Sequence, residues 1–197
     1  FTSAQAGGTW SGTGISPAGL FNPATAGVGS HDITYTIAGL CGDANTVTVN
    51  VHPAPIVSIG EDVTICDGQS VTIDAGAGFV NYAWTPFGQG TQTINATTSN
   101  TYSVVVTDAN NCTATDSKVV TVLPNDDATI TTAILSYCDY HAPVQFTSAQ
   151  AGGTWSGTGI SPAGLFNPAT AGVGSHDISY TIAGLCGDAN TVTVNVH

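Results

Sequence analysis

Residues 174–196 read GSHDISYTIAGLCGDANTVTVNV, and two runs in this stretch alternate apolar and polar residues on either side of a glycine-containing segment. Strict alternation puts every second side chain on the same face of a strand, which is typical of a sheet with one buried face. Similar runs are SVTIDA, NYAWT, TYSVVVT and KVVTVL, and sustained helical periodicity is absent from the sequence. The sequence therefore predicts an all-β fold of antiparallel sheets stacked as a sandwich.

The opening stretch belongs to a long internal repeat. Residues 1–52 match residues 146–197 at every aligned position except one, where Thr34 faces Ser179, and the offset is 146 − 1 = 145 residues. Near-identity at a long fixed period predicts a tandem array. The 197 residues then correspond to a window of about one and a third units. The sequence contains no signal peptide, anchor or apolar run that could span a bilayer, so we expect attachment to depend on residues outside this window.

Two proline-bearing segments divide the repeat unit. HPAP at residues 52–55 and LPNDD at residues 123–127 each follow a strand, and proline suits a strand end or linker because it cannot donate a hydrogen bond to a ladder. The predicted domains are residues 53–124, called the middle region, and residues 125–197, called the C-terminal region. Residues 1–52, the N-terminal region, are then the C-terminal part of a preceding copy of the second domain. Short linkers with proline predict a semi-rigid string.

The composition excludes several classes of partner. The chain has one lysine (Lys118), no arginine and 13 acidic residues, which gives a formal net charge of −12. A protein that binds nucleic acid or inserts at an anionic membrane surface needs a basic patch, and one lysine cannot form one. Only 7% of the residues are charged, so the surface depends on polar uncharged side chains for hydration. Either glycans or neighbouring copies are expected to cover part of it.

The cysteines and tryptophans repeat a common plan in both predicted domains. In the middle region Cys66 precedes Trp84 by 18 residues and Cys112 follows it by 28; in the C-terminal region Cys138 precedes Trp155 by 17 and Cys186 follows it by 31. We interpret this plan as tandem immunoglobulin-like β-sandwich domains in a 145-residue two-domain repeat, each with one disulfide packed near its tryptophan. The predicted bonds are Cys66 to Cys112 and Cys138 to Cys186, and Trp10, the counterpart of Trp155, is a predicted core residue.

Cys41 and the position of an Asp-Ala-Asn sequence depart from this common plan. Cys41 is the counterpart of Cys186, so its predicted partner is the counterpart of Cys138, which falls upstream because 138 − 145 = −7. The alternative is a reactive or intermolecular thiol. An Asp-Ala-Asn sequence precedes Cys112 but follows Cys186, so we expect these two cysteines to lie on opposite sides of the last hairpin. The placement of the disulfides in the core therefore stays open.

Disulfides have consequences for stability and for compartment. Closing a loop of nearly fifty residues is worth roughly 4 kcal/mol to a small domain in the chain-entropy model. Two such bonds predict an oxidising, extracellular compartment. A cytosolic zinc site is disfavoured, because the sequence has no CxxC pair and its histidines show no ligand spacing beside cysteine: His31, His52, His141, His176 and His197.

Acidic residues fall mostly in turns, where aspartate bonds the nearby backbone. The alternative to this structural role is a calcium site, because an oxygen-rich linker can hold a hard cation. The candidate ligands are Asp126 and Asp127. His31 and its copy His176 could act as a pH switch, but each is better read as a polar residue at a loop-to-strand boundary. GGTWSGTG lacks the features of a phosphate loop, although its tryptophan could form a platform for sugar. Asn95 and Asn111 match the N-glycosylation pattern.

The motifs carry a resemblance over the whole chain. TICDGQSVTIDAG, NYAWTPFGQGTQTI and TYSVVVTDANNCTATDS in the middle region resemble the PKD-like and immunoglobulin-like repeats of large Bacteroidota surface proteins, with WTPFGQG in place of a WDFGDG-like turn. GGTWSGTGIS, GLFNPATAGVGSHDISYTI and CGDANTVTVNV are similar to a second repeat type that accompanies them. The resemblance implies type IX secretion through a C-terminal sorting domain and a role as a giant adhesin, including those of gliding motility.

Three functions remain open at the level of sequence. The first is an adhesin stalk that projects a binding tip, and the second is a self-assembling filament or sheath. The third, more distant, is a carbohydrate-binding module. No nucleophile with a base and no paired carboxylates are evident, so we expect no enzymatic activity and no cofactor, calcium apart. Expected partners are neighbouring repeats, other copies in a fibre, and a surface glycan or a host or substratum ligand.

Overall fold

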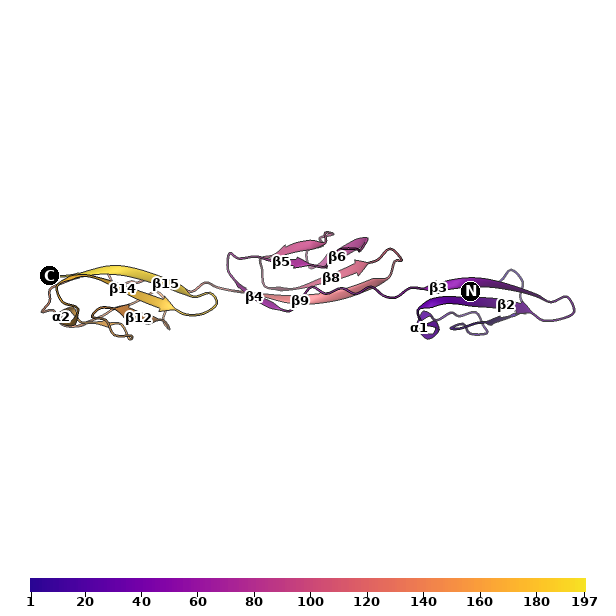
Figure 1. Cartoon of the computed structure of the whole chain (residues 1–197), viewed down its shortest axis with the longest axis horizontal. Coiled ribbons are helices and arrows are strands. Elements are labelled where there is room, and N and C mark those ends of the chain that lie inside the picture. The colour runs from indigo at the N-terminus through magenta and orange to yellow at the C-terminus, as the bar shows by residue number, and fades with distance from the viewer. The chain divides into compact units, whose positions relative to one another are not determined.

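The computed structural model describes residues 1–197 and confirms the all-β prediction (Figure 1). The exceptions are two helices of four residues, α1 and α2. Neither has the length and apolar character needed to cross a membrane. The elements are β1 (Thr9–Ser11), α1 (Pro23–Ala26), β2 (Gly29–Ile37), β3 (Asp43–Val51), β4 (Val63–Cys66), β5 (Val71–Asp74), β6 (Asn81–Thr85), β7 (Thr93–Ala96), β8 (Asn100–Thr107), β9 (Thr113–Leu123), β10 (Ser136–Tyr137), β11 (Val144–Gln145), β12 (Thr154–Gly157), β13 (Leu165–Phe166), α2 (Pro168–Ala171), β14 (Gly174–Ile182) and β15 (Asp188–Val196).

The alternating stretch forms the long antiparallel hairpin β14–β15, in which Ile178 faces Val192. The inward side chains of Ile178, Tyr180, Ile182, Val194 and Val196 are buried and Val192 is partly buried. On the outer face the hydroxyls of Ser179 and Thr191 share a 2.8 Å hydrogen bond. The pattern read from the sequence therefore sets which face packs inward. The hairpin β2–β3 repeats the same register 145 residues earlier, with Ile33 facing Val47, and Thr34 bonds Thr46 at the same 2.8 Å.

The C-terminal region builds a sandwich around this hairpin. One sheet has the order β10-β15-β14-β12, and β11 pairs with β13 in a second, two-stranded sheet. β10 runs parallel to the end of β15, with Tyr137 facing Val196. The core residues are Ala128, Ile130, Tyr137, Phe146, Trp155, Phe166, Ile178, Tyr180, Ile182, Val194 and Val196.

The middle region has the same arrangement of first and last strands. Its larger sheet has the order β4-β9-β8-β6, its smaller one pairs β5 with β7, and β4 runs parallel to the end of β9. Trp84 is 1% exposed and donates from its indole N–H to the carbonyl of Thr91 at 2.8 Å. On β9, the N–H of Val119 donates to a carboxylate oxygen of Asp62 at 2.8 Å.

The N-terminal region contains the sheet β1-β2-β3 and is packed less fully than its copy. Ile33 is completely buried, as Ile178 is. Phe1, however, is 48% exposed whereas its counterpart Phe146 is 2% exposed, and Trp10 is only half-buried against Phe1 and Tyr35. The same residues therefore occupy two different environments in one chain.

Contacts group the chain into two compact units. The first comprises residues 1–59, 74–92 and 103–117, and the second comprises residues 60–73, 93–102 and 118–197. Because this division passes through the middle region, the domain boundaries at the two proline-bearing linkers stay a prediction.

Phe166 and its counterpart Phe21 provide a matched test of the core. Phe166 is fully buried against Phe146 and Tyr137, whereas Phe21 is half-buried. We expect Phe166→Ala to lower the free energy of unfolding of the C-terminal region by about 3–5 kcal/mol, because the cavity it leaves adds to the lost burial. Phe21→Ala should cost clearly less. Urea unfolding followed by circular dichroism measures both, and equal losses would contradict the assignment of the core.

Candidate functional site

The structure contains one disulfide, between Cys66 and Cys186, with a Cα–Cα distance of 5.5 Å and a sequence separation of 120 residues. Cys41, Cys112 and Cys138 are free thiols. The pairing predicted from the sequence, Cys66 to Cys112 and Cys138 to Cys186 within each region, is therefore wrong. The bond instead ties the middle region to the C-terminal region across the linker at Pro124.

Strand geometry explains why Cys66 cannot reach Cys112. Cys66 faces Leu123 in the parallel pair β4–β9, at the end of β9, whereas Cys112 comes immediately before the first residue of β9. The first and last residues of a strand of 11 residues are separated by ten steps of ~3.3 Å, or about 33 Å. Bridged cysteines need a Cα–Cα distance below about 7 Å, so these two lie at opposite ends of one sheet.

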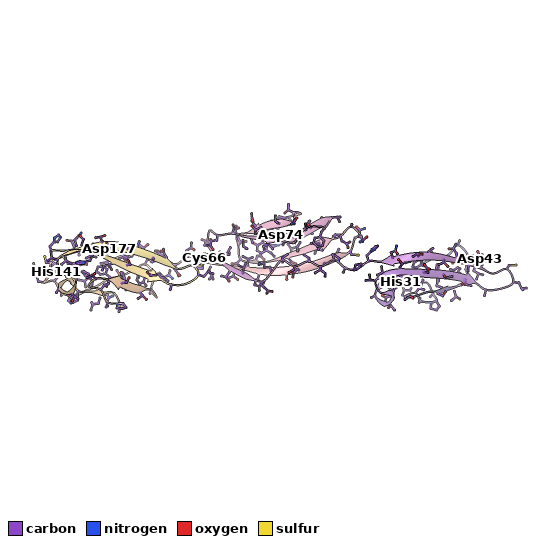
Figure 2. All side chains as sticks on the ribbon, viewed as in Figure 1. His31, Asp43, Cys66, Asp74, His141 and Asp177 are labelled. Atoms are coloured by element: carbon purple, nitrogen blue, oxygen red, sulfur yellow. A yellow bond between two sulfur atoms is a disulfide. The ribbon has the colours of Figure 1, made fainter.

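The same geometry separates Cys138 from Cys186. Cys138 follows β10, which pairs with the last residues of β15, and Cys186 precedes the first residue of β15. The nine residues of β15 span about 26 Å. Figure 2 shows His141, three residues after Cys138, at the far end of the C-terminal region from Cys66.

The linker between the two bonded cysteines is fixed by hydrogen bonds. The side-chain amide of Asn125 donates to the carbonyl of Asp67 at 3.2 Å, and the N–H of Asp126 donates to the carbonyl of Cys186 at 3.0 Å. Gln150 holds the following turn, because its amide donates to the Asp126 carboxylate at 2.6 Å and its oxygen accepts from the N–H of Asp127 at 2.9 Å. Segment 125–127 is therefore anchored on both sides of the disulfide.

These hydrogen bonds bear on the calcium hypothesis for Asp126 and Asp127. Each carboxylate accepts from a protein donor, and hydrogen bonds from the hydroxyl and N–H of Thr129 lower the pKa of Asp127. Asp188, which lines the same polar pocket as Asp126, accepts from the N–H of Ala128 at 3.0 Å. No three His, Cys, Asp or Glu side chains gather as a metal-binding group. The arrangement serves to hold the linker.

A groove of about 430 Å³ lies on the N-terminal region. Both apolar and polar side chains line it. The lining residues are Phe1, Thr2, Ser3, Ala4, Gln5, Trp10, Ile33, Tyr35, Ile37, Asp43, Asn45 and Val47.

In the C-terminal region the counterpart face is packed against another part of the chain. There, segment 126–132 lies along the counterpart face and pairs with it at Ser148 through Ile130. The carboxylate of Asp188, the counterpart of Asp43, accepts from the N–H of Ala128, and the amide oxygen of Asn190, the counterpart of Asn45, accepts from the N–H of Ile130. Ala128 and Ile130 are buried in the core of the C-terminal region. The residues that line the groove are therefore counterparts of residues that segment 126–132 covers in the C-terminal region.

A peptide with the sequence of residues 126–137 should bind the N-terminal groove of the full chain. Its backbone would meet Asp43 and Asn45 as the built-in segment meets their counterparts, and Ile130 would pack against the apolar lining residues. Isothermal titration calorimetry measures the affinity. The same peptide with Ile130→Asp is the matched control, and equal binding of the two peptides would contradict a specific groove.

The remaining candidates have structural roles. His31 and His176 each donate from Nε2 to a carbonyl at 2.8 Å, that of Gly27 and of Gly172, just after α1 and α2. Trp84 and Trp155 are 1% and 6% exposed, so neither offers a platform for sugar, whereas Trp10 is half-buried and lines the groove. The side-chain oxygen of Asn95 accepts from the hydroxyl of Thr72 at 2.7 Å on an exposed surface.

The middle and C-terminal regions each contain a four-stranded and a two-stranded sheet, which agrees with the predicted all-β sandwich. No protein-family model and no curated protein sequence matches the chain. Among solved structures it is similar to the insect immune protein hemolin, at 11% identity over 85% of this chain and 56% of that one, with a TM-score of 0.41. Immunoglobulin domains 1–4 of Sidekick-1 are 10% identical over 98% and 68% of the two chains, with a TM-score of 0.44. Drosophila N-cadherin EC1–4 is 11% identical over 85% and 56%, with a TM-score of 0.40.

The prediction that Cys112 and Cys186 lie on opposite sides of the last hairpin is wrong. Cys112 and Cys186 occupy the same place, just before the last strand of their regions, despite the shifted Asp-Ala-Asn sequence. Cys66 and Cys138 share the other place, at the end of the first strand. The signal that could have found this is the position of each cysteine relative to the first and last strands, once those strands are known to be parallel.

Alkylation of free thiols distinguishes the two pairings directly. In the denatured, non-reduced chain we expect label on Cys41, Cys112 and Cys138, and none on Cys66 or Cys186. The pairing within regions would leave only Cys41 labelled. Peptide mapping by mass spectrometry reads out each site, and a linked peptide pair containing Cys66 and Cys112 would contradict the structure.

Proposed function

We propose that the chain is part of a non-enzymatic, extracellular repeat protein that acts as a load-bearing stalk in adhesion. The observation that carries the proposal is the Cys66–Cys186 disulfide, which joins successive regions rather than stabilising one core. A bond in this position transmits tension past the linker at Pro124 without straining the hydrogen bonds of Asn125 and Asp126.

The chemistry of the chain supports an extracellular role. Disulfides persist in oxidising compartments, and a surface with 13 acidic residues and one lysine does not suit nucleic acid. The solved hemolin structure is described with implications for homophilic adhesion, and adhesion is also the role that we propose here. The resemblance of the motifs to Bacteroidota surface repeats extends the proposal to type IX secretion and gliding-motility adhesins.

A self-assembling filament is the second candidate, and one observation favours it. Large apolar side chains are exposed at matching places in both copies, where Leu40 and Leu185 are 109% and 66% exposed and Val28 and Val173 are 66% and 71% exposed. Such residues could pack against other copies. Light scattering separates the candidates: a monomer near 19.7 kDa at rising concentration supports the stalk, and growing assemblies support the filament.

Single-molecule force spectroscopy of the full chain tests the load-bearing role. In the oxidised chain the disulfide keeps the segment between Cys66 and Cys186, a separation of 120 residues, from extending. Cys186→Ser should therefore lengthen the fully extended chain by roughly 400 Å at ~3.6 Å per residue. We also expect discrete unfolding peaks in both forms, because each sandwich resists force through its own core. A Cys112→Ser variant is the matched control and should leave the length unchanged. A featureless extension curve would contradict a mechanical role.

A further inference from the structure

The disulfide in the structure follows a simple positional rule. We call the end of a region at which its last strand finishes the outgoing end, and the opposite end the incoming end. Cys66 lies at the outgoing end of the middle region, facing Leu123, and Cys186 lies at the incoming end of the C-terminal region, before β15. The bond therefore joins the outgoing end of one region to the incoming end of the next.

Cys138 reproduces the surroundings of Cys66. The N–H of the residue after Cys66, Asp67, donates to the carbonyl of Leu123 at 2.8 Å. The N–H of the residue after Cys138, Asp139, donates to the carbonyl of His197 at 3.0 Å. Cys138 is thus placed at the outgoing end of the C-terminal region as Cys66 is placed in the middle region.

The turn that follows each of these cysteines is also the same. The carbonyl of Cys66 accepts from the N–H of Gln69 at 3.0 Å, and the carbonyl of Cys138 accepts from the N–H of His141 at 3.0 Å. In return, the N–H of Cys66 donates to the Gln69 side chain at 3.0 Å, and that of Cys138 donates to Nδ1 of His141 at 3.1 Å. Two regions of different sequence thus hold a cysteine in one local geometry.

Cys112 and Cys186 both lie at the incoming end of their regions, shortly before the last strand. Asp126, which bonds the carbonyl of Cys186, comes 126 − 123 = 3 residues after Leu123. In the middle region Val63 faces Val120, an offset of 57, and the bond from the N–H of Ile59 to the Asp116 carboxylate keeps that offset toward the incoming end.

The same offset places a linker residue beside Cys112. Extrapolating the offset of 57 to Cys112 gives 112 − 57 = 55, which is Pro55, and Pro55 comes 55 − 52 = 3 residues after His52. His52 is the copy of His197. This extrapolated spacing of three residues equals the spacing observed from Leu123 to Asp126.

We propose that Cys138 forms a disulfide with Cys112 of a following copy of the middle region, so that every junction in the array is closed by a covalent bond. By the same rule Cys41, the copy of Cys186, bonds the Cys66 position of a preceding copy. This replaces the Cys138-type partner that the sequence predicted for Cys41. The inference rests on the tandem array of the proposed function, but not on what the array binds.

The chemistry needs one oxidant. The two thiols lose two protons and two electrons as their sulfurs join, and a disulfide of the thiol-exchange class, such as oxidised glutathione, accepts them and is reduced to two thiols. All three free cysteines are at least partly exposed, so such a reagent can reach them.

The test extends the full chain by one unit. Residues 1–197 are followed directly by a second copy of residues 53–197, which reproduces the His52–Pro53 junction and gives 5 + 4 = 9 cysteines. After folding in a glutathione redox buffer, free thiols are alkylated and disulfide-linked peptides are mapped. We expect loss of labelling at Cys138 of the first unit and at Cys112 of the added copy, with a linked peptide pair between them.

The extended chain contains its own controls. Cys41, the original Cys112 and the final Cys138 have no partner in it and should stay labelled. Cys112→Ser in the added copy should restore labelling of the first Cys138, whereas Cys112→Ser in the original copy should not. Full labelling of the first Cys138, a bond within one region, or disulfide-linked dimers would overturn the proposal. Force spectroscopy and light scattering of the unextended chain judge the proposed function separately.

Discussion

The rest of the structure depends on the parallel pairing of the first and last strands in each region. β4 runs beside the end of β9, and β10 runs beside the end of β15, so the chain enters at one end of each sandwich and leaves at the other. A cysteine after the first strand and a cysteine before the last strand are then separated by the length of a strand. This constraint prevents a bond within either region and leaves Cys66 and Cys186 to link two successive regions.

Much of the fold could be predicted because its determinants are local. The alternation in residues 174–196 sets the faces of β14 and β15, and the near-identity of residues 1–52 with residues 146–197 sets the register of β2 and β3. The disulfide could not be predicted in this way. The spacing of Cys66, Trp84 and Cys112 fits the immunoglobulin plan, but which cysteines meet depends on a parallel pairing between strands more than fifty residues apart, and local pattern carries no information about it.

The candidate sites show the same division between local and distant information. Aspartates were expected to bond the nearby backbone, as Asp127 does with the N–H of Thr129, whereas the Asp126 carboxylate accepts from the distant side chain of Gln150. That Asp188 and Asn190 would hold the backbone of segment 126–132 depends on contacts about sixty residues apart, so only the structure reveals it. The groove on the N-terminal region follows from this: identical residues make a packed face where that segment lies on them and an open one where it does not.

The single lysine has a consequence for the resistance of the chain to proteolysis. Proteases of the trypsin class cut after lysine or arginine, and the only such peptide bond in the chain joins Lys118 to Val119. That bond lies within β9, and the N–H of Val119 is held by Asp62. A protease must open the central sheet of the middle region before it can cut, so scarcity of positive charge also makes the chain durable.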